Sequence, residues 1–491
     1  MRAGGRVGDR RARRFFSGAD LAGKIAADPV SRGGARRTNI SSLDDDLLLK
    51  LLRRLPIDAA VRTSVLSTRW CHLWKGVQDL SFCDLVSHTR SFSDLVREVL
   101  AGRESEEIRR LVIWIAKRSN ASIFLVNPWI RIAAARVTGQ FELQLPALGD
   151  DDAHGFIEVP SFSKARLLSI KAMDVELRLQ RDGVFLALRG MLFTGVRLSQ
   201  HGTSLGHIVT HCCPKLQILQ LSRVSGIGEL TLCSSSLIEL RLAHVTEMVR
   251  LEVTTPGLRR IYLVNCFAFS LDLELDAVVV TAPMLSAVNW QGPCPRGVNF
   301  PGKTILDSLC VSESSSEVEE HSSFMDVLKR FRFTNLLTVH MPITRTTEEH
   351  QGLIEPIRLP KVEELELFLT TNGHLFAETV VSFLRRCTGL KRLQLNLVYL
   401  DDHSDCICGC RRAEVWDQAV YFGSLVELVW RAFRGTLDEK KFLLKVFWRG
   451  SLRKFTAELL GNAEQAAEIK QWLHAVCPTS CVLEFHDSTT N

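Results

Sequence analysis

Leucines recur at helical spacing near the N-terminal end of the chain. Leu43, Leu47, Leu51 and Leu55 lie four residues apart, and residues 44–46 are three aspartates. Side chains at positions i and i+4 share one face of a helix, so this stripe predicts an amphipathic helix. Acids in the first turn favour the same start, because the N-terminal end of a helix dipole is positive.

Two further helices are predicted to follow. Pro56 lacks a backbone donor and disfavours helix for Leu55, so the chain has to turn there. The apolar positions of the second helix are Ile57, Ala60, Val61 and Val65. After Ser67, a cap residue, the third apolar stripe consists of Trp70, Leu73, Trp74 and Val77. Three short helices bury too little surface to cover this many large side chains by themselves.

Trp70 and Trp74 would share one face of the third helix. That face either packs inside this protein or is kept for a partner. A large apolar surface on so small a unit usually marks an interface, which favours the partner. The alternative is a plain three-helix subdomain with both tryptophans internal.

Beyond residue 100 a second pattern returns: an apolar residue, two others, an apolar, one other, and an apolar. Its clearest copies begin at Leu216, Leu237 and Leu258, each 21 residues after the last. A fixed period with this pattern is the leucine-rich-repeat signature. Each copy predicts a short strand with its apolar side chains turned inward and a helical or irregular return limb on the convex side. Looser copies begin at Ile108, Leu167, Phe193, Leu285, Leu306, Leu336, Val362, Leu390, Leu425 and Leu452.

The asparagine or cysteine that follows the strand in regular repeats is largely replaced. The three best copies have Val224, Val245 and Cys266 at this position. An asparagine ladder is therefore not expected, and we predict a less regular curve than in a standard horseshoe. One return limb, residues 205–212, has helical spacing.

The run ISSLDDDLLLKLLRRLPIDAAVRTSVLSTRWCHLWKGVQDLSF resembles the plant F-box over 43 residues. The resemblance implies docking onto the Skp-type linker of a cullin-RING ubiquitin ligase. The family's proline after the first leucine is Asp44 here, which is expected to weaken docking modestly. By position, the resemblance implies that the linker contact, or the packing behind it, is carried by Leu43, Leu47, Leu51, Leu55, Pro56, Val61, Val65, Trp70, Leu73 and Trp74.

The segment 425–460 resembles the FBD segment that closes many plant F-box repeat proteins. It contains an apolar strand, a turn at Phe433 and Gly435, and a helical stretch. A helix near 464–476 and the strand CVLEF are predicted to cap the array, as exposed ends of such stacks require. The predicted α/β organisation is a basic tail at 1–38, a three-helix F-box at 39–84, an irregular leucine-rich-repeat solenoid at 85–415 with a parallel sheet on its concave face, and an FBD-like cap at 416–491.

Composition and charge refine this picture. The net charge of +6 arises in residues 1–37, where nine Arg and one Lys face three Asp, so the remainder carries about −1. We expect a disordered tail that is solvated, with nucleic-acid binding as the less favoured alternative. Apolar stretches are far shorter than the roughly 20 residues that span a bilayer, and no signal peptide is recognised. We therefore expect a soluble protein of the nucleus and/or cytoplasm, where its 14 cysteines stay reduced.

Three chemical motifs have plainer explanations. GTSLG at 202–206 matches a nucleophile elbow, but a turn that caps the next helix explains Ser204 better. Cys406, Cys408 and Cys410 are too closely spaced for a usual zinc site. The serine-rich acidic stretch 312–323 is either an inert loop or a phosphorylation site. No catalytic residue, cofactor or metal is predicted.

These observations predict a non-enzymatic substrate receptor. Its F-box would dock on the Skp-type linker, and through it on a cullin, while the solenoid binds a target protein whose identity the sequence does not disclose. The receptor would act by proximity, raising the local concentration of target lysines at the ligase. The alternative is a ligase-independent scaffold or decoy, and Asp44 in place of the family's proline is the observation that favours it.

Overall fold

A computed structural model describes most of the chain. The described residues are 40, 43–55, 57–84, 91–102, 107–116, 122–147, 155–180, 183–199, 204–267, 277–295, 297–312, 327–343, 359–371, 375–387, 389–399 and 422–487. The basic tail, Pro56, residues 313–323 of the serine-rich stretch and Cys406, Cys408 and Cys410 lie outside them.

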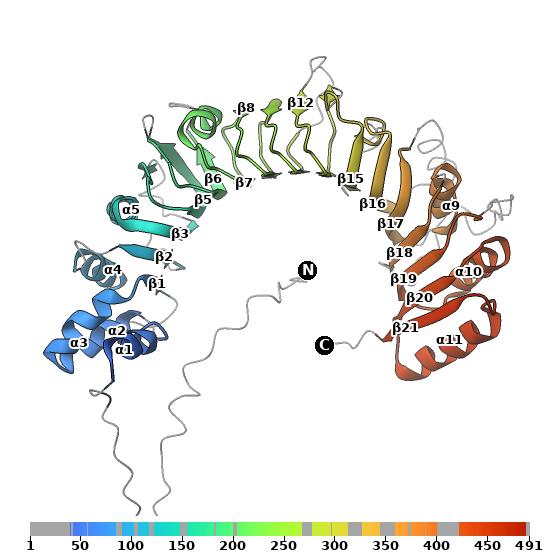
Figure 1. Cartoon of the computed structure of the whole chain (residues 1–491), viewed down its shortest axis with the longest axis horizontal. Coiled ribbons are helices and arrows are strands. Elements are labelled where there is room, and N and C mark those ends of the chain that lie inside the picture. Colours follow the sequence, from blue (N-terminus) through green and yellow to red (C-terminus); the bar gives the residue numbers. More distant parts are fainter. Residues whose placement is uncertain are drawn as a thin grey trace, which may run out of the picture.

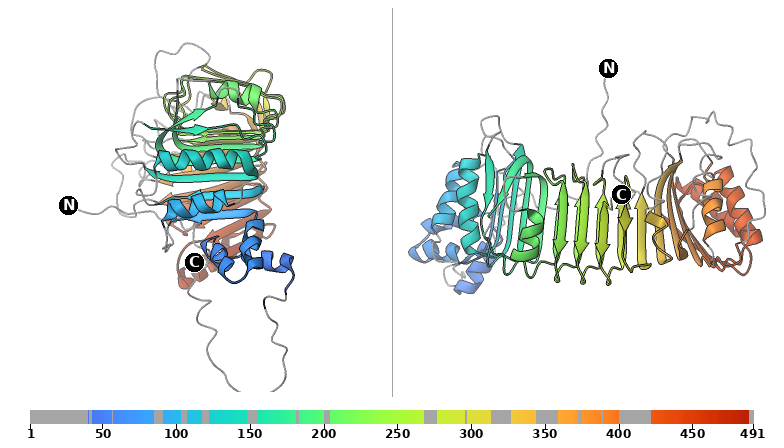
Figure 2. Two further views of the ribbon diagram at one scale, coloured as in Figure 1. Left: turned by 90° about the vertical axis from the view of Figure 1, so that its left-hand side faces the viewer. Right: turned by 90° about the horizontal axis from the view of Figure 1, so that it is seen from above.

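The strands form an arc whose inner side is a 17-stranded sheet (Figure 1). Each strand pairs in parallel with its neighbours along the chain, and Figure 2 shows them side by side from above. A parallel sheet on the concave face was predicted and is confirmed. Its strands are β1 (Asp79–Cys83), β2 (Ile108–Trp114), β3 (Val137–Ala147), β4 (Phe156–Val159), β5 (Leu167–Leu179), β6 (Gly190–Leu198), β7 (Ile218–Ser222), β9 (Glu239–Ala243), β11 (Arg260–Val264), β13 (Ala287–Gln291), β15 (Ile305–Ser312), β16 (Phe333–Ile343), β17 (Lys361–Thr371), β18 (Arg392–Tyr399), β19 (Glu427–Phe433), β20 (Lys454–Leu459) and β21 (Val482–Asp487).

Helices lie on the convex side towards both ends of the arc (Figure 1). On this side the apolar face of each helix covers the outer surface of the sheet. These helices are α4 (Phe92–Ala101), α5 (Ile123–Arg136), α6 (Leu205–His207), α9 (Ala377–Arg386), α10 (Leu437–Arg449) and α11 (Ala463–Val476). The predicted helical limb at 205–212 is present as α6 followed by a π-helical turn, Ile208–Cys212.

The middle return limbs differ from the prediction, because they contain strands. They pair in parallel as a second, four-stranded sheet of β8 (Glu229–Cys233), β10 (Arg250–Thr254), β12 (Val278–Thr281) and β14 (Val298–Asn299). The physical reason is a short alternation of apolar and other residues, as at Leu230 and Leu232, both of which are buried. The centre of the arc therefore has a sheet on each side.

A ladder of backbone hydrogen bonds stands where regular repeats carry an asparagine ladder, which the sequence predicted to be absent. Arg223, His244 and Asn265 each follow a strand and adopt left-handed φ angles of 53°, 52° and 47°. Their N–H groups donate to carbonyls of the next repeat at 2.7, 2.7 and 2.8 Å. The left-handed turn lets the following side chains, Val224, Val245 and Cys266, point into the core, where they are buried.

The C-terminal part follows the predicted order of strand, turn, helix, strand, helix and strand. After β19 ends at Phe433, Gly435 has a φ of +69°, which a glycine adopts without strain. Thr436 and Glu439 then form a reciprocal capping box at the start of α10. Among the described residues, no helix is long and apolar enough to cross a membrane.

Candidate partner-docking surface

Three short helices at one end of the arc form a helical module, which we define as residues 43–76. It consists of α1 (Asp45–Leu52), α2 (Ile57–Arg62) and α3 (Thr68–Leu73), with 3-10 turns at Thr63–Val65 and Trp74–Gly76. Asp44 is the N-cap of α1, although its side chain accepts no capping bond. Ser67 caps α3 as predicted, because its hydroxyl accepts a hydrogen bond from the Trp70 N–H.

Arg69 braces the start of α3 against the start of α1. Its Nε donates to Oδ1 of Asp45 at 2.7 Å, and its Nη2 donates to the carbonyl of Leu43 at 2.7 Å. These partners precede Arg69 by 24 and 26 residues in the chain. The charged hydrogen bonds therefore hold α3 in a fixed orientation against α1. The brace thereby sets which face of α1 is left open.

The open face of α1 is apolar. Leu47, Leu51 and Leu55 are 46%, 45% and 44% exposed, and their spacing of four puts them in one stripe. Val65 is 86% exposed beside Leu66, because the chain tightens from α2 into a 3-10 turn that rotates Val65 outward. We call these five residues the apolar stripe.

The tryptophan pair lies inside the protein. Trp70 and Trp74 are only 6% and 7% exposed, and Leu73 is equally buried. Gly102, at the end of α4, lies against the Trp74 ring so closely that a Cβ there would be 3.4 Å from it. The interpretation of this pair as an exposed anchor is therefore wrong for the free chain. Part of the cover over Trp74 therefore comes from Gly102, outside the module.

The remaining predicted contact residues fall between these extremes. Leu43 and Val61 are half-buried against the core, and Pro56 lies outside the described residues. The predicted set thus divides into an exposed stripe and the packing behind it.

The helical module is joined to the arc by a shared strand. β1 pairs with β2 over five residues, and its Phe82 is buried. Asp79 of β1 and Arg109 of β2 form an ion pair beside this junction, and the hydrogen bond from Arg109 lowers the pKa of the Asp79 carboxyl. β1 lies within the predicted F-box range, yet it is the first strand of the large sheet.

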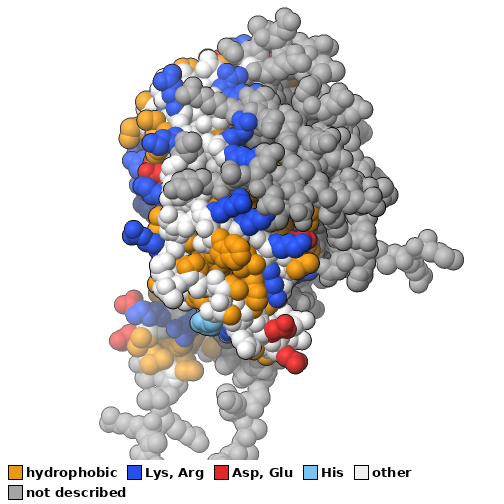
Figure 3. Space-filling model, turned by 90° about the vertical axis from the view of Figure 1, so that its right-hand side faces the viewer, with side chains coloured by type: hydrophobic (Ala, Val, Ile, Leu, Met, Phe, Trp, Pro, Cys, Tyr) orange, Lys and Arg blue, Asp and Glu red, His pale blue; other side chains and the backbone are white. Residues whose placement is uncertain are grey.

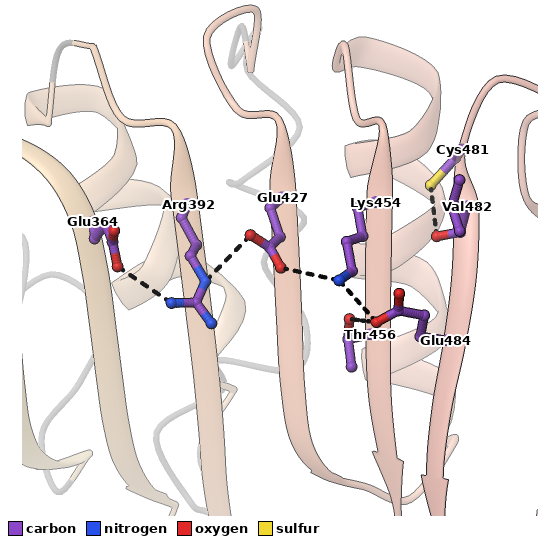
Figure 4. Close-up of polar contacts among 8 residues, drawn as sticks. All are labelled: Glu364, Arg392, Glu427, Lys454, Thr456, Cys481, Val482 and Glu484. Atoms are coloured by element: carbon purple, nitrogen blue, oxygen red, sulfur yellow. Dashed lines mark hydrogen bonds and ion pairs between the residues drawn. The ribbon is translucent and has the colours of Figure 1, made fainter.

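A ladder of alternating charges crosses the concave face near the other end of the arc (Figure 4). Arg392 lies between Glu364, at 3.2 Å, and Glu427, at 3.4 Å. Lys454 lies between Glu427, at 3.8 Å, and Glu484, at 2.8 Å. Each member comes from the next strand in order, so the paired charges follow the register of the sheet.

The middle of the concave face carries two further features. Glu239 is buried between the guanidinium groups of Arg241 and Arg260, and the latter donates at 2.8 Å. The rings of His340 and Phe368 stack with centroids 4.2 Å apart, and burial lowers the pKa of His340.

The other chemical motifs can be placed only in part. The Ser204 hydroxyl accepts a hydrogen bond from the His207 N–H at 3.2 Å, so the predicted capping role is confirmed. Within the described residues, no three His, Cys, Asp or Glu side chains gather as they would around a metal ion.

Comparison with known proteins finds similarity to F-box proteins over most of the chain. A family model described as the F-box domain matches residues 40–86. An F-box/FBD/LRR-repeat protein of Arabidopsis thaliana is 23% identical over 74% of this chain and 74% of its own length. A second one is 31% identical over 64% of each chain. F-box/LRR-repeat protein 13 of the same plant is 28% identical over 61% of this chain and 70% of its own.

Proposed function

Because this chain contains an F-box and resembles F-box/FBD/LRR-repeat proteins over most of its length, we propose that it is the substrate receptor of a Skp-cullin-F-box ubiquitin ligase. The F-box docks on the Skp-type linker, and the concave face of the solenoid binds a target protein. The chain itself catalyses nothing: it holds the target near the ubiquitin-charged subunits. We place it in the nucleus and/or the cytoplasm.

The apolar stripe is the observation that carries this proposal. Leu47 and Leu51 of α1 and Leu55 in the turn after it are nearly half exposed, whereas the adjacent face of α1, at Leu48 and Leu52, is fully buried. Leaving this much leucine surface in water costs free energy. Full burial of an exposed leucine is worth about 1.5 to 3 kcal/mol, so a partner that covers these half-exposed side chains recovers roughly 1 kcal/mol for each. Trp70, Leu73 and Trp74 support the stripe from behind, where they hold the module on the arc.

The test is binding of the full chain to a purified Skp-type linker, measured by calorimetry. A Leu47→Glu, Leu51→Glu variant places two charges in the apolar stripe and should raise the dissociation constant by at least about 30-fold. Met284→Glu is the matched control, because Met284 is similarly exposed but lies on the solenoid. Equal affinity in the stripe variant and in the control would contradict the proposed contact.

A ligase-independent scaffold or decoy is the second candidate, and Asp44 is the observation that favours it. The Asp44 side chain makes no capping bond, so α1 begins without the first-turn proline of the family and without a substitute for it. Under this alternative the wild-type chain fails to bind the linker. An Asp44→Pro variant that regains binding would identify the missing proline as the cause.

A further inference from the structure

The two ends of the large sheet are closed to different degrees. At one end, Phe82 of β1 is fully buried beneath the helical module. At the other end, Leu483 and Phe485 of β21 are only half-buried. Their neighbours in register on β20, Phe455 and Ala457, are fully buried. The last strand therefore keeps core-type side chains partly in water.

The outer edge of β21 is also open. Within residues 422–487 this strand pairs with β20 alone, in an unbroken register from Val482 to Asp487. It contains no proline, lysine or bulge, which are common devices that prevent edge pairing. Figure 3 shows this end of the molecule, where hydrophobic side chains gather in the middle of the face. An open edge beside apolar surface is a template for another strand.

The two faces of β21 carry different chemistry. Glu484 faces the concave side, where it meets Lys454 and Thr456 (Figure 4), and His486 faces the same side two residues on. Phe485 faces the convex side, where it contacts Lys470 and His474 of α11. Glu484 ends the charge ladder and has a basic neighbour on one side only.

We propose that the edge of β21 binds β21 of a second copy in antiparallel orientation. Residues directly opposite each other in such a pair lie on the same face of the sheet. An even-numbered residue must therefore lie opposite an even-numbered one, and an odd-numbered residue opposite an odd-numbered one. Centring the pair on Glu484 would set two carboxylates against each other, and centring it on His486 would set two imidazoles together. Centring it on Phe485 places Glu484 opposite His486 twice and stacks the two phenylalanines.

This register suits a two-fold symmetric dimer, because each copy offers the same surface and receives its complement. It covers the half-buried Phe485, sets Leu483 opposite Asp487, and continues the charge ladder across the junction. The two large sheets become one sheet, and the two helical modules lie at its far ends. The contact is small compared with standard protein interfaces, so association is weak.

Sedimentation velocity of the full chain tests the dimer over about 1 to 100 µM, the range in which weak contacts associate. The wild type should change from monomer to dimer in this range. His486→Glu sets two like-charged pairs across the junction and should raise the dissociation constant by at least about tenfold. His486→Lys is the matched control, because it places a lysine ammonium group opposite Glu484 and should dimerise at least as well as the wild type.

Both substitutions lie at an exposed side chain, and circular dichroism should give the same thermal midpoint for both. The proposal would be overturned by a wild type that stays monomeric up to the highest concentration. Equal association of His486→Glu and His486→Lys would also overturn it. The measurement needs no ligase component, so its result is independent of the proposed receptor function.

Discussion

The hydroxyl of Tyr399, at the end of β18, donates a 3.0 Å hydrogen bond to the carboxylate of Glu439 in the first turn of α10. Glu439 is fully buried. The other carboxylate oxygen accepts the backbone N–H groups of Arg434, at 3.1 Å, and Thr436, at 2.9 Å. Burial raises the pKa of Glu439, and these hydrogen bonds oppose the shift. One side chain thus joins a strand, a turn and a helix.

Replacing Glu439 should separate its hydrogen bonds from its charge. Glu439→Gln keeps an oxygen for the two backbone donors. Its amide N–H group donates to the Tyr399 hydroxyl oxygen, which reverses that hydrogen bond, so the free energy of unfolding should change by less than about 1 kcal/mol. Glu439→Leu leaves three partly buried donors without an acceptor and should cost about 2 to 4 kcal/mol. Urea denaturation at pH 7 measures both. Similar losses in the two variants would show that the hydrogen bonds are not what stabilises the cap.

Comparing the wild type with Glu439→Gln at different pH values reports the direction of the pKa shift of Glu439. Since the folded-state pKa of Glu439 is raised, the native carboxyl keeps its proton at pH values where the unfolded one has lost it. The stability of the wild type relative to Glu439→Gln should therefore fall as pH rises from the ordinary glutamate pKa of 4.5 to the raised folded-state pKa, and stay level above it. A difference that rises with pH would mean that the carboxylate form is favoured in the fold.

Gly226 and Gly228 form a matched pair two residues apart. Gly226 has a φ of +82°, and a Cβ there would lie 2.3 Å from the carbonyl oxygen of Leu198. No heavy atom lies within 4 Å of a Cβ at Gly228. We expect Gly226→Ala to cost about 2 kcal/mol or more and Gly228→Ala to be neutral or slightly stabilising. Thermal melts compare them directly, and equal midpoints would contradict the left-handed turn.

The thiols should differ sharply in reactivity. Burial raises the pKa of Cys213 and of Cys387 to about 12, so at pH 8 almost none of either is thiolate. Cys233 is exposed. A short pulse of iodoacetamide on the folded protein should label Cys233 and spare the other two, as read by peptide mass spectrometry. Denaturation before the pulse is the control and should label all three.

The spacing of leucines was enough to predict most strands of the large sheet, although β1, β3 and β4 carry no predicted copy. In L-x-x-L-x-L, both the period of two and the recurrence every 21 residues restrict the chain. Copies as different as those at Leu216 and Val362 both lead into strands in which the leucines of the pattern are buried. The strands β8, β10 and β12 were missed. An alternation of only four or five residues is too short to separate a strand from the irregular limb that the repeat pattern predicted.

The docking surface was predicted only in part, for a physical reason. Leu47 and Leu51 have the same spacing of four as Trp70 and Trp74, and spacing does not tell which pair is covered. The covering group at Gly102 comes from a helix beyond the module, and a cover of this kind leaves no sign in the module's own pattern. For Glu439 a signal did exist, because a threonine three residues before a glutamate marks a capping box.

The strand β1 has a mechanical consequence. β1 belongs to the docking end of the chain and is also hydrogen-bonded to β2 over five residues. The twist of the sheet therefore sets the angle between the docking end and the rest of the arc. On the proposed function, the arc holds a bound target at a fixed distance and direction from the docking end. The position of a target along the arc then determines which lysines of the target come within reach of the ligase. The concave face and the docking helices would together select the lysine that is modified.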